Sequence, residues 1–208
     1  MIHSLSARAY LLACDADKGR VHDRRRVALL VRAAAFADLL LRGRVVDHSG
    51  RVTATGLGPT GDRLLDDLLT QVVGYGPVAW RPLLRRDSGD TLRALEHHLA
   101  GAGVLEARTT RLLHRTVLRL TDPAAARQAR ASADHALRAP LSEVDPEDGV
   151  LTALAAAAGT GVGRAEAHRH ATRLAQLAAA GGAAVPELRR AVRRLRARRV
   201  AVASGGGG

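Results

Sequence analysis

Apolar residues recur every three or four positions over residues 24–42, and this spacing constrains the fold more than any other feature of the sequence. The stripe consists of leucine and alanine: Leu29, Leu30, Ala33, Ala34, Ala37, Leu40 and Leu41. Such a period places apolar side chains on one face of an α-helix, and Gly43 after the stripe is typical of a helix end. The segment predicts a long helix, in a chain of 208 residues that can bury a substantial core.

Similar signals elsewhere predict a chain made mostly of helices. Helical spacing or a proline near the first helical position marks these further segments: 4–14 (helix or strand), 59–73, 77–86, 90–102, about 163–180, and the segments that begin at Pro123, Pro146 and Pro186. Two stretches change to a β-like period: 44–56, with a turn at His48–Gly50, and 104–120, with a turn around Ala107 to Arg111. We expect a mainly α, single-domain helical bundle with surrounding helices and two small β-hairpins over residues 1–203. A flexible glycine-rich tail is expected over 204–208.

The charge balance indicates an anionic partner. Lys+Arg 32 against Asp+Glu 20 gives a net charge of +12, which favours nucleic acid, acidic lipid headgroups or phosphorylated ligands. A GC-rich coding sequence also favours Arg over Lys, but it does not explain the excess of positive charge. Aromatic residues make up only 2% of the chain, which counts against base stacking on single-stranded nucleic acid.

Features that the sequence lacks narrow the location and the chemistry. No run of about 18 uncharged apolar residues is present, no signal peptide is evident, and the one cysteine, Cys14, suits a reducing cytosol. No Ser or Cys lies in a nucleophile elbow, and the nine histidines show no metal-ligand spacing. The Gly56–Gly61 run matches the glycine motif of dinucleotide-binding proteins. Asp62 follows it and places a negative charge where the phosphates would bind, which counts against a dinucleotide site. We therefore expect a cytoplasmic protein that is not an enzyme and needs no cofactor.

Two arginine-rich segments are candidates for binding. Arg24–Arg26 open the long helix, and Arg25 and Arg32 are seven residues apart, so both project the same way if the helix is continuous. Two guanidinium groups on one face suit a phosphate, whereas the simpler interpretation is a solvated face. The last helix carries arginines between Leu188 and Val200 beside an apolar stripe. Packing with a solvated basic face is favoured there over membrane or nucleic-acid binding.

Four motifs follow one another along the chain. They are Leu39-Leu-Leu-Arg-Gly-Arg-Val45, Pro59-Thr-Gly-Asp-Arg-Leu-Leu-Asp-Asp-Leu-Leu69, Leu99-Ala-Gly-Ala-Gly-Val-Leu105 and Leu120-Thr-Asp-Pro123. Together they resemble the Golgi phosphoprotein 3 family over residues 5–200, and the run that begins at Pro59 is the most specific part. The composition, rich in Arg and Ala and poor in Lys, resembles an actinobacterial member.

The resemblance implies a mostly helical, peripheral membrane protein on the cytoplasmic face of a membrane. It implies binding of phosphatidylinositol 4-phosphate and an adaptor role for membrane-protein clients. Arg32 falls where the family has a headgroup-binding arginine, whereas the family's membrane-wedging Trp falls near Asp23–Arg24 and is missing. The implied headgroup residues, with neighbours that compensate for missing arginines, are Arg24, Arg25, Arg32, Arg85, Arg86 and Arg93. The implied hairpin for membrane contact or self-association contains Arg111, Leu112, Leu113, Arg115, Val117 and Leu118.

A DNA-binding regulator is the alternative. Residues 77–119 have the order helix, helix and wing of a winged-helix module, with helix 90–102 in the major groove. Arg93 is the one permanently charged basic side chain of that helix, and Glu96 would face the phosphates. Nucleic acid is therefore the less favoured partner.

Overall fold

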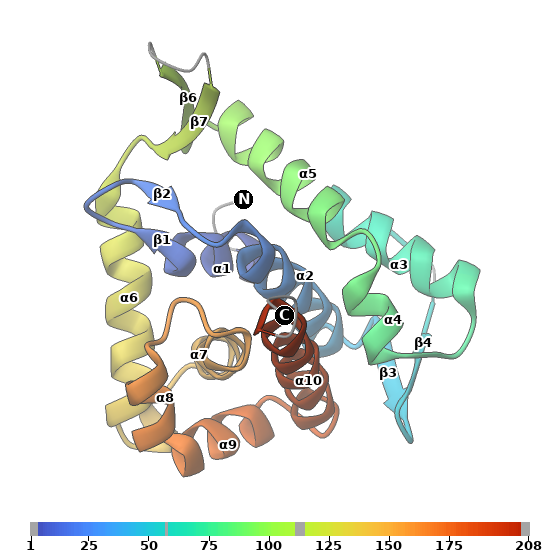
Figure 1. Ribbon diagram of the computed structural model, residues 1–208. Coiled ribbons are helices and arrows are strands. Elements are labelled where there is room, and N and C mark those ends of the chain that lie inside the picture. Colours follow the sequence, from blue (N-terminus) through green and yellow to red (C-terminus); the bar gives the residue numbers. More distant parts are fainter. Residues whose placement is uncertain (1–3, 57, 111–114, 205–208) are drawn as a thin grey trace.

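The computed structural model describes residues 4–56, 58–110 and 115–204 and is mainly α-helical, as the sequence predicts (Figure 1). Its helices are α1 (Leu5–Ala13), α2 (Arg24–Leu41), α3 (Arg63–Tyr75), α4 (Trp80–Arg85), α5 (Ser88–Gly101), α6 (Pro123–Arg138), the 3₁₀ turn η1 (Leu141–Glu143), α7 (Pro146–Ala158), α8 (Arg164–Arg169), α9 (Ala171–Ala180) and α10 (Val185–Ser204). Its short antiparallel strands are β1 (Cys14–Asp15), β2 (Arg20–Val21), β3 (Val45–His48), β4 (Arg51–Ala54), β5 (Val78–Ala79), β6 (Leu105–Thr110) and β7 (Arg115–Leu120).

Helix α2 lies at the centre of the fold. The side chain of Asp23 caps its start by accepting a hydrogen bond from the backbone N–H of Arg26 at 3.1 Å. The chain leaves the helix through Gly43, whose φ of 64° suits a residue without a Cβ atom. Every residue from Val27 to Leu39 is buried, because α1, α5, α7 and α10 pack around the helix (Figure 1). The predicted long helix is confirmed, and its whole circumference belongs to the core.

The first predicted hairpin is confirmed, and it gains a third strand. Strands β3 and β4 pair around a turn at Ser49 and Gly50. Strand β5 adds to the other edge of β4, with Val52 opposite Val78. The helix predicted over 77–86 therefore begins only at Trp80, because the two preceding residues extend to pair with β4.

The second predicted hairpin is present, but its turn lies further along the chain. Strands β6 and β7 pair from Leu105 opposite Leu120 to Thr110 opposite Arg115. The sequence predicts a turn around Ala107 to Arg111. For Ala107 to Thr110 this prediction is wrong, because these residues pair with β7. No Gly, Pro or Asn in that stretch specifies a turn, so cross-strand pairing extends through it.

Residues 163–180 form two helices where the sequence predicts one. Helix α8 ends at Arg169, His170 breaks the geometry at φ −102°, and α9 follows. The break lets α9 pack on α7 and lets Arg173 Nε donate to the carbonyl oxygen of Ala136 on α6 at 3.0 Å. Tertiary contacts therefore override the helix propensity of this alanine-rich segment.

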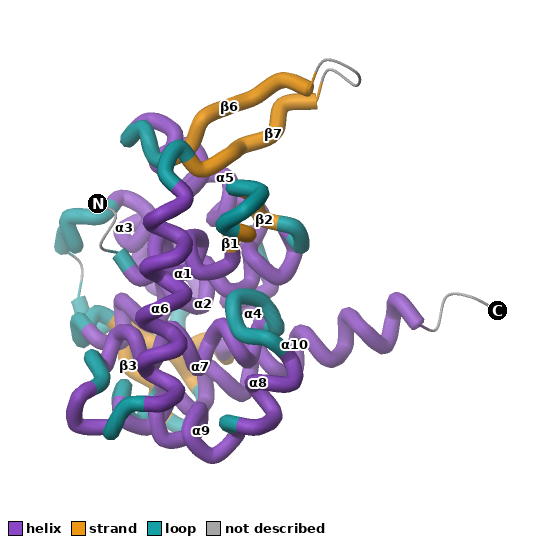
Figure 2. The backbone as a smooth tube through the Cα atoms, turned by 90° about the vertical axis from the view of Figure 1, so that its left-hand side faces the viewer, coloured by secondary structure: helices purple, strands orange, loops and turns teal. Residues whose placement is uncertain are grey.

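Helix α10 runs out from the body of the molecule (Figure 2). Its last residue is Ser204, which the sequence assigned to the tail, and residues 205–208 lie outside the described part of the chain. Across residues 4–56, 58–110 and 115–204, no helix has both the length and the apolar character needed to cross a bilayer.

Candidate functional site

Arg32, placed in a headgroup site by the family resemblance, is fully buried. Its Nε donates to the carbonyl oxygen of Leu83 at 2.5 Å. Its two terminal nitrogens donate to Thr91 Oγ1 at 2.7 Å and to Gln71 Oε1 at 2.8 Å. The guanidinium carbon also lies 5.4 Å from the centroid of the Phe36 ring. Burial lowers the pKa of Arg32, and nearby ionisable groups partly oppose this shift.

These contacts make Arg32 a bridge between helices. It joins α2 to Gln71 on α3, Leu83 on α4 and Thr91 on α5. The last carbonyl groups of a helix lack partners within it, and Arg32 supplies a donor to one of them on α4. Helix α2 is continuous, as the prediction of a shared face for Arg25 and Arg32 required, but the expectation that both guanidinium groups are accessible is wrong. Arg25 is exposed in the first turn of α2, whereas Arg32 is enclosed by the neighbouring helices.

Arg24 is held by a carboxylate from the helix expected to read DNA. Its terminal nitrogens lie 2.7 and 2.6 Å from the two carboxylate oxygens of Glu96, and Tyr10 donates to the same group at 3.3 Å. The DNA hypothesis placed Glu96 opposite the phosphates of a nucleic acid. Glu96 is only 4% exposed, so it faces the core instead. The hydrogen bond from Arg24 to Glu96 raises the pKa of Arg24, and burial raises the pKa of Tyr10.

The remaining predicted headgroup residues lie on or next to α4 and α5, and all are exposed. Arg85 ends α4, and the guanidinium of Arg86 lies 4.9 Å from the centroid of the Tyr75 ring. Arg93 forms an ion pair with Asp90 one turn earlier on the same helix. Of the six predicted residues, Arg24, Arg32 and Arg93 thus have hydrogen-bond or ion-pair partners within the fold.

The β6–β7 hairpin is anchored at its base and projects from the helical body (Figure 2). Leu105 and Leu120 are buried, and the backbone N–H of Leu120 donates to the carbonyl oxygen of Gly19 at 2.7 Å. Among the predicted hairpin residues, Val117 and Leu118 are half-buried. The backbone of Arg115 pairs with Thr110, and the predicted residues Arg111, Leu112 and Leu113 lie outside the described part of the chain.

The fold and the motifs can now be compared with known families. A family model of Golgi phosphoprotein 3 (GPP34) matches residues 5–195. The chain belongs to the Golgi phosphoprotein 3 family. The match covers the helical bundle from α1 into α10, together with the hairpin. A search among curated proteins found no significant match.

Another basic surface of this GPP34 chain involves arginines outside the predicted headgroup set. It combines Arg26 and Arg164 with five arginines of α10: Arg189, Arg190, Arg193, Arg194 and Arg196. The sequence patterns assigned Arg26 to the start of the long helix and the α10 arginines to a solvated face. The spacing of Arg189, Arg193 and Arg196 places them on one side of a helix, and this was the available signal. Within the described residues, no three His, Cys, Asp or Glu side chains are grouped to hold a metal.

Proposed function

We propose that this GPP34 chain is a peripheral membrane protein that binds anionic lipid headgroups and has a binding role, not a catalytic one. Family membership supports the proposal, and phosphatidylinositol 4-phosphate is the ligand that the family resemblance implies. The net charge of +12 supports attraction to an acidic surface. In an actinobacterial member, which the composition favours, other acidic lipids would supply the same charge.

The observation that carries the proposal is the projecting β6–β7 hairpin (Figure 2). Its described side chains include the exposed Arg108 and Arg119, although Arg108 is also within 2.6 Å of Glu106. An element that stands away from the body reaches a surface before the body does. Basic residues near an anionic surface contribute about 1 kcal/mol each, so electrostatics replaces the wedge that the missing Trp would supply.

The family also supports two further roles for the same surface. We propose that the membrane-bound chain acts as an adaptor for membrane-protein clients, and that the hairpin takes part in self-association. Both roles depend on the hairpin being accessible, which agrees with its position outside the helical body in Figure 2.

Vesicle co-sedimentation tests the lipid-binding proposal. Vesicles of phosphatidylcholine alone are compared with vesicles that also contain phosphatidylglycerol, cardiolipin or phosphatidylinositol 4-phosphate. We expect binding only to the anionic vesicles, and the bound fraction should fall with added salt because salt screens exposed charges. Equal binding to neutral and anionic vesicles, or none to any of them, contradicts the proposal.

Charge reversal then tests the hairpin. The variant Arg111→Glu with Arg115→Glu should lose vesicle binding. The matched control, Arg63→Glu with Arg127→Glu, makes the same charge change at exposed positions on α3 and α6. If the two double variants bind vesicles equally, the hairpin is not the membrane contact.

A further inference from the structure

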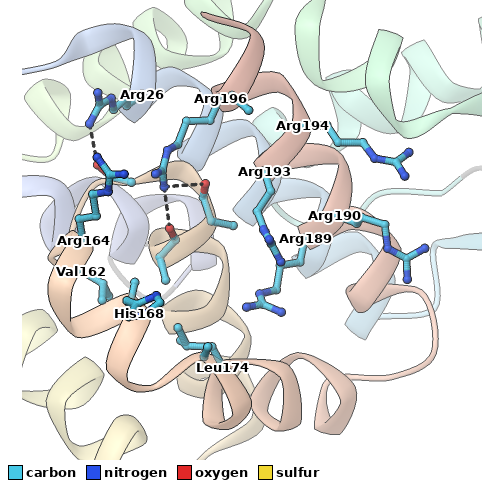
Figure 3. A pocket seen from close by; sticks show the side chains of 16 residues that line it. Arg26, Val162, Arg164, His168, Leu174, Arg189, Arg190, Arg193, Arg194 and Arg196 are labelled. Atoms are coloured by element: carbon cyan, nitrogen blue, oxygen red, sulfur yellow. Dashed lines mark hydrogen bonds between the residues drawn. The ribbon is translucent and has the colours of Figure 1, made fainter. Parts of the chain in front are cut away.

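A groove with a volume of about 1030 Å³ lies between α10 and the segment from α7 to α9 (Figure 3). Ala156, Ala157 and Val162 contribute apolar lining, and Leu174 contributes from α9. Helices α8 and α9, which border the groove, lie at the opposite end of the molecule from the β6–β7 hairpin (Figures 1 and 2). None of the described lining residues belongs to the hairpin, since they come from α2, from the segment between α7 and α9, and from α10.

Arginines from three distant parts of the sequence converge on this groove. Arg26 comes from the first turn of α2, Arg164 from the start of α8, and Arg189, Arg193 and Arg196 from α10. Figure 3 shows Arg189 and Arg193 extending from α10 towards the side where His168 and Leu174 lie. Arg190 and Arg194 complete the basic lining.

Two of these arginines are fixed by backbone carbonyl groups at the end of α7. Arg26 donates to the carbonyl oxygen of Gly159 at 3.1 Å, and Arg196 donates to that of Ala156 at 3.2 Å (Figure 3). A carbonyl group orients a guanidinium without cancelling its charge. Arg26 also forms an ion pair with Asp23 at 2.9 Å, on the side chain's Nε.

The positive charge of the groove is compensated only in part: besides the Arg26–Asp23 pair, Arg190 forms an ion pair with Glu187 at 2.6 Å. No Asp or Glu is among the lining residues. Within the described part of the chain, Arg164 and Arg193 form no ion pair, and the buried Nε of Arg189 has no hydrogen-bond partner. Burial lowers the pKa of Arg189, and the neighbouring charge of Arg193 lowers it further.

The same repulsion acts on Arg196. Burial lowers its pKa first, and the charges of Arg26, Arg164 and Arg193 add to the effect. Like charges held together without counterions destabilise the folded state, and such arrangements are concentrated at functional sites. An anion in the groove would relieve this repulsion.

We propose that the groove binds a phosphate ester that carries several phosphate groups, either as a free molecule or as a lipid headgroup. Guanidinium groups bind phosphate oxygens through paired hydrogen bonds, and several arginines suit several phosphates. The apolar lining suits the carbon skeleton of such an ester. Nucleic acid fits less well, because none of the four aromatic residues lines the groove to stack a base.

Calorimetric titration with inositol hexakisphosphate, pyrophosphate and inorganic phosphate tests the site. We expect the hexakisphosphate to bind most tightly, with one molecule per chain and an affinity that falls as salt is added. Arg189→Gln with Arg193→Gln should weaken this binding about tenfold or more. Arg63→Gln with Arg127→Gln removes the same charge elsewhere and should change it by less than about twofold.

Two further measurements keep the test decisive. Without ligand, the groove variant should unfold at a urea concentration equal to or higher than that of the parent, because the substitution relieves repulsion between arginines. Weaker ligand binding by this variant would then not result from unfolding. Arg193→Lys keeps the positive charge but loses the planar guanidinium group with its paired donors. This variant should bind the hexakisphosphate with intermediate affinity. Equal loss of binding in the groove and control variants overturns the proposal.

The source of the phosphate groups follows from competition. If the hexakisphosphate displaces the chain from anionic vesicles, the groove holds a lipid headgroup; if vesicle binding is unchanged, the groove holds a free phosphate ester. Binding of a DNA duplex that depends on Arg189 and Arg193, without binding of the hexakisphosphate, overturns the proposal. The hairpin variant should keep hexakisphosphate binding, so failure at the groove and failure of membrane binding are distinguishable.

Discussion

Replacing Arg32 tests whether this arginine holds the fold together. Arg32 donates hydrogen bonds to Leu83, Thr91 and Gln71. After substitution, the three acceptors differ in whether another hydrogen-bond partner is available to them. The hydroxyl of Thr91 still donates to the carbonyl oxygen of Asp87 at 3.0 Å, and the half-buried Gln71 reaches solvent. The carbonyl of Leu83 keeps no partner among the described residues, so its desolvation is the main uncompensated loss.

The magnitude follows from these contacts. A buried acceptor without a partner costs about 1–3 kcal/mol, and truncation to alanine also removes packed methylene groups worth about 2 kcal/mol. We expect Arg32→Ala to lower the free energy of unfolding by about 3–5 kcal/mol. Arg32→Met keeps most of the packing and removes a buried charge, so its expected cost is about 1–3 kcal/mol.

Urea denaturation followed by tryptophan fluorescence measures the loss. Trp80 is the one tryptophan of the chain, is 4% exposed and lies 5.9 Å from the Phe36 ring, so unfolding changes its surroundings. The free energy comes from linear extrapolation to zero urea. Arg85→Met serves as the matched control, because it removes an exposed arginine and should change stability by less than about 0.5 kcal/mol.

Two results would contradict this reasoning. If both Arg32 variants unfold within about 0.5 kcal/mol of the parent protein, Arg32 does not support the fold. If Arg32→Met remains stable but no longer binds anionic vesicles, Arg32 contacts the lipid headgroup and its main role is in binding.

The remaining predictions concern a buried thiol and a glycine contact. Burial raises the pKa of the Cys14 thiol from its ordinary value of 9.0 to about 12. Since the folded pKa lies above the unfolded one, this contribution to stability is present below pH 9.0 and is lost as the pH rises towards 12. Urea titrations over this range should show a smaller loss for Cys14→Ala than for the parent, and an equal loss would assign the alkaline instability to other groups. A methyl group at Gly181 would overlap the Cγ2 atom of Val150, so Gly181→Ala should cost about 1–3 kcal/mol of unfolding free energy. Gly89→Ala, which meets no atom within 4 Å, should be neutral or stabilising, and the same loss at both positions would show that overlap is not the cause.

The sequence predicted the helical framework well because helix signals are local. Asp122 and Asp145 cap α6 and α7 by accepting backbone hydrogen bonds at 2.8 Å, as their positions before proline indicate. The turn in the second hairpin and the break at His170 were not predictable in the same way. Strand pairing set the first, and the packing of α9 set the second.

The arginines show the limit of sequence reasoning most clearly. The sequence by itself determined the helices, the excess of positive charge and the order of motifs that marks the family. Only the tertiary structure decided that Arg32 is buried in a network of hydrogen bonds and that Arg26 and Arg164 lie beside the α10 arginines. The physical reason is that the environment of a long charged side chain depends on what packs across from it. Those neighbours are distant in sequence and leave no periodic pattern around the residue itself.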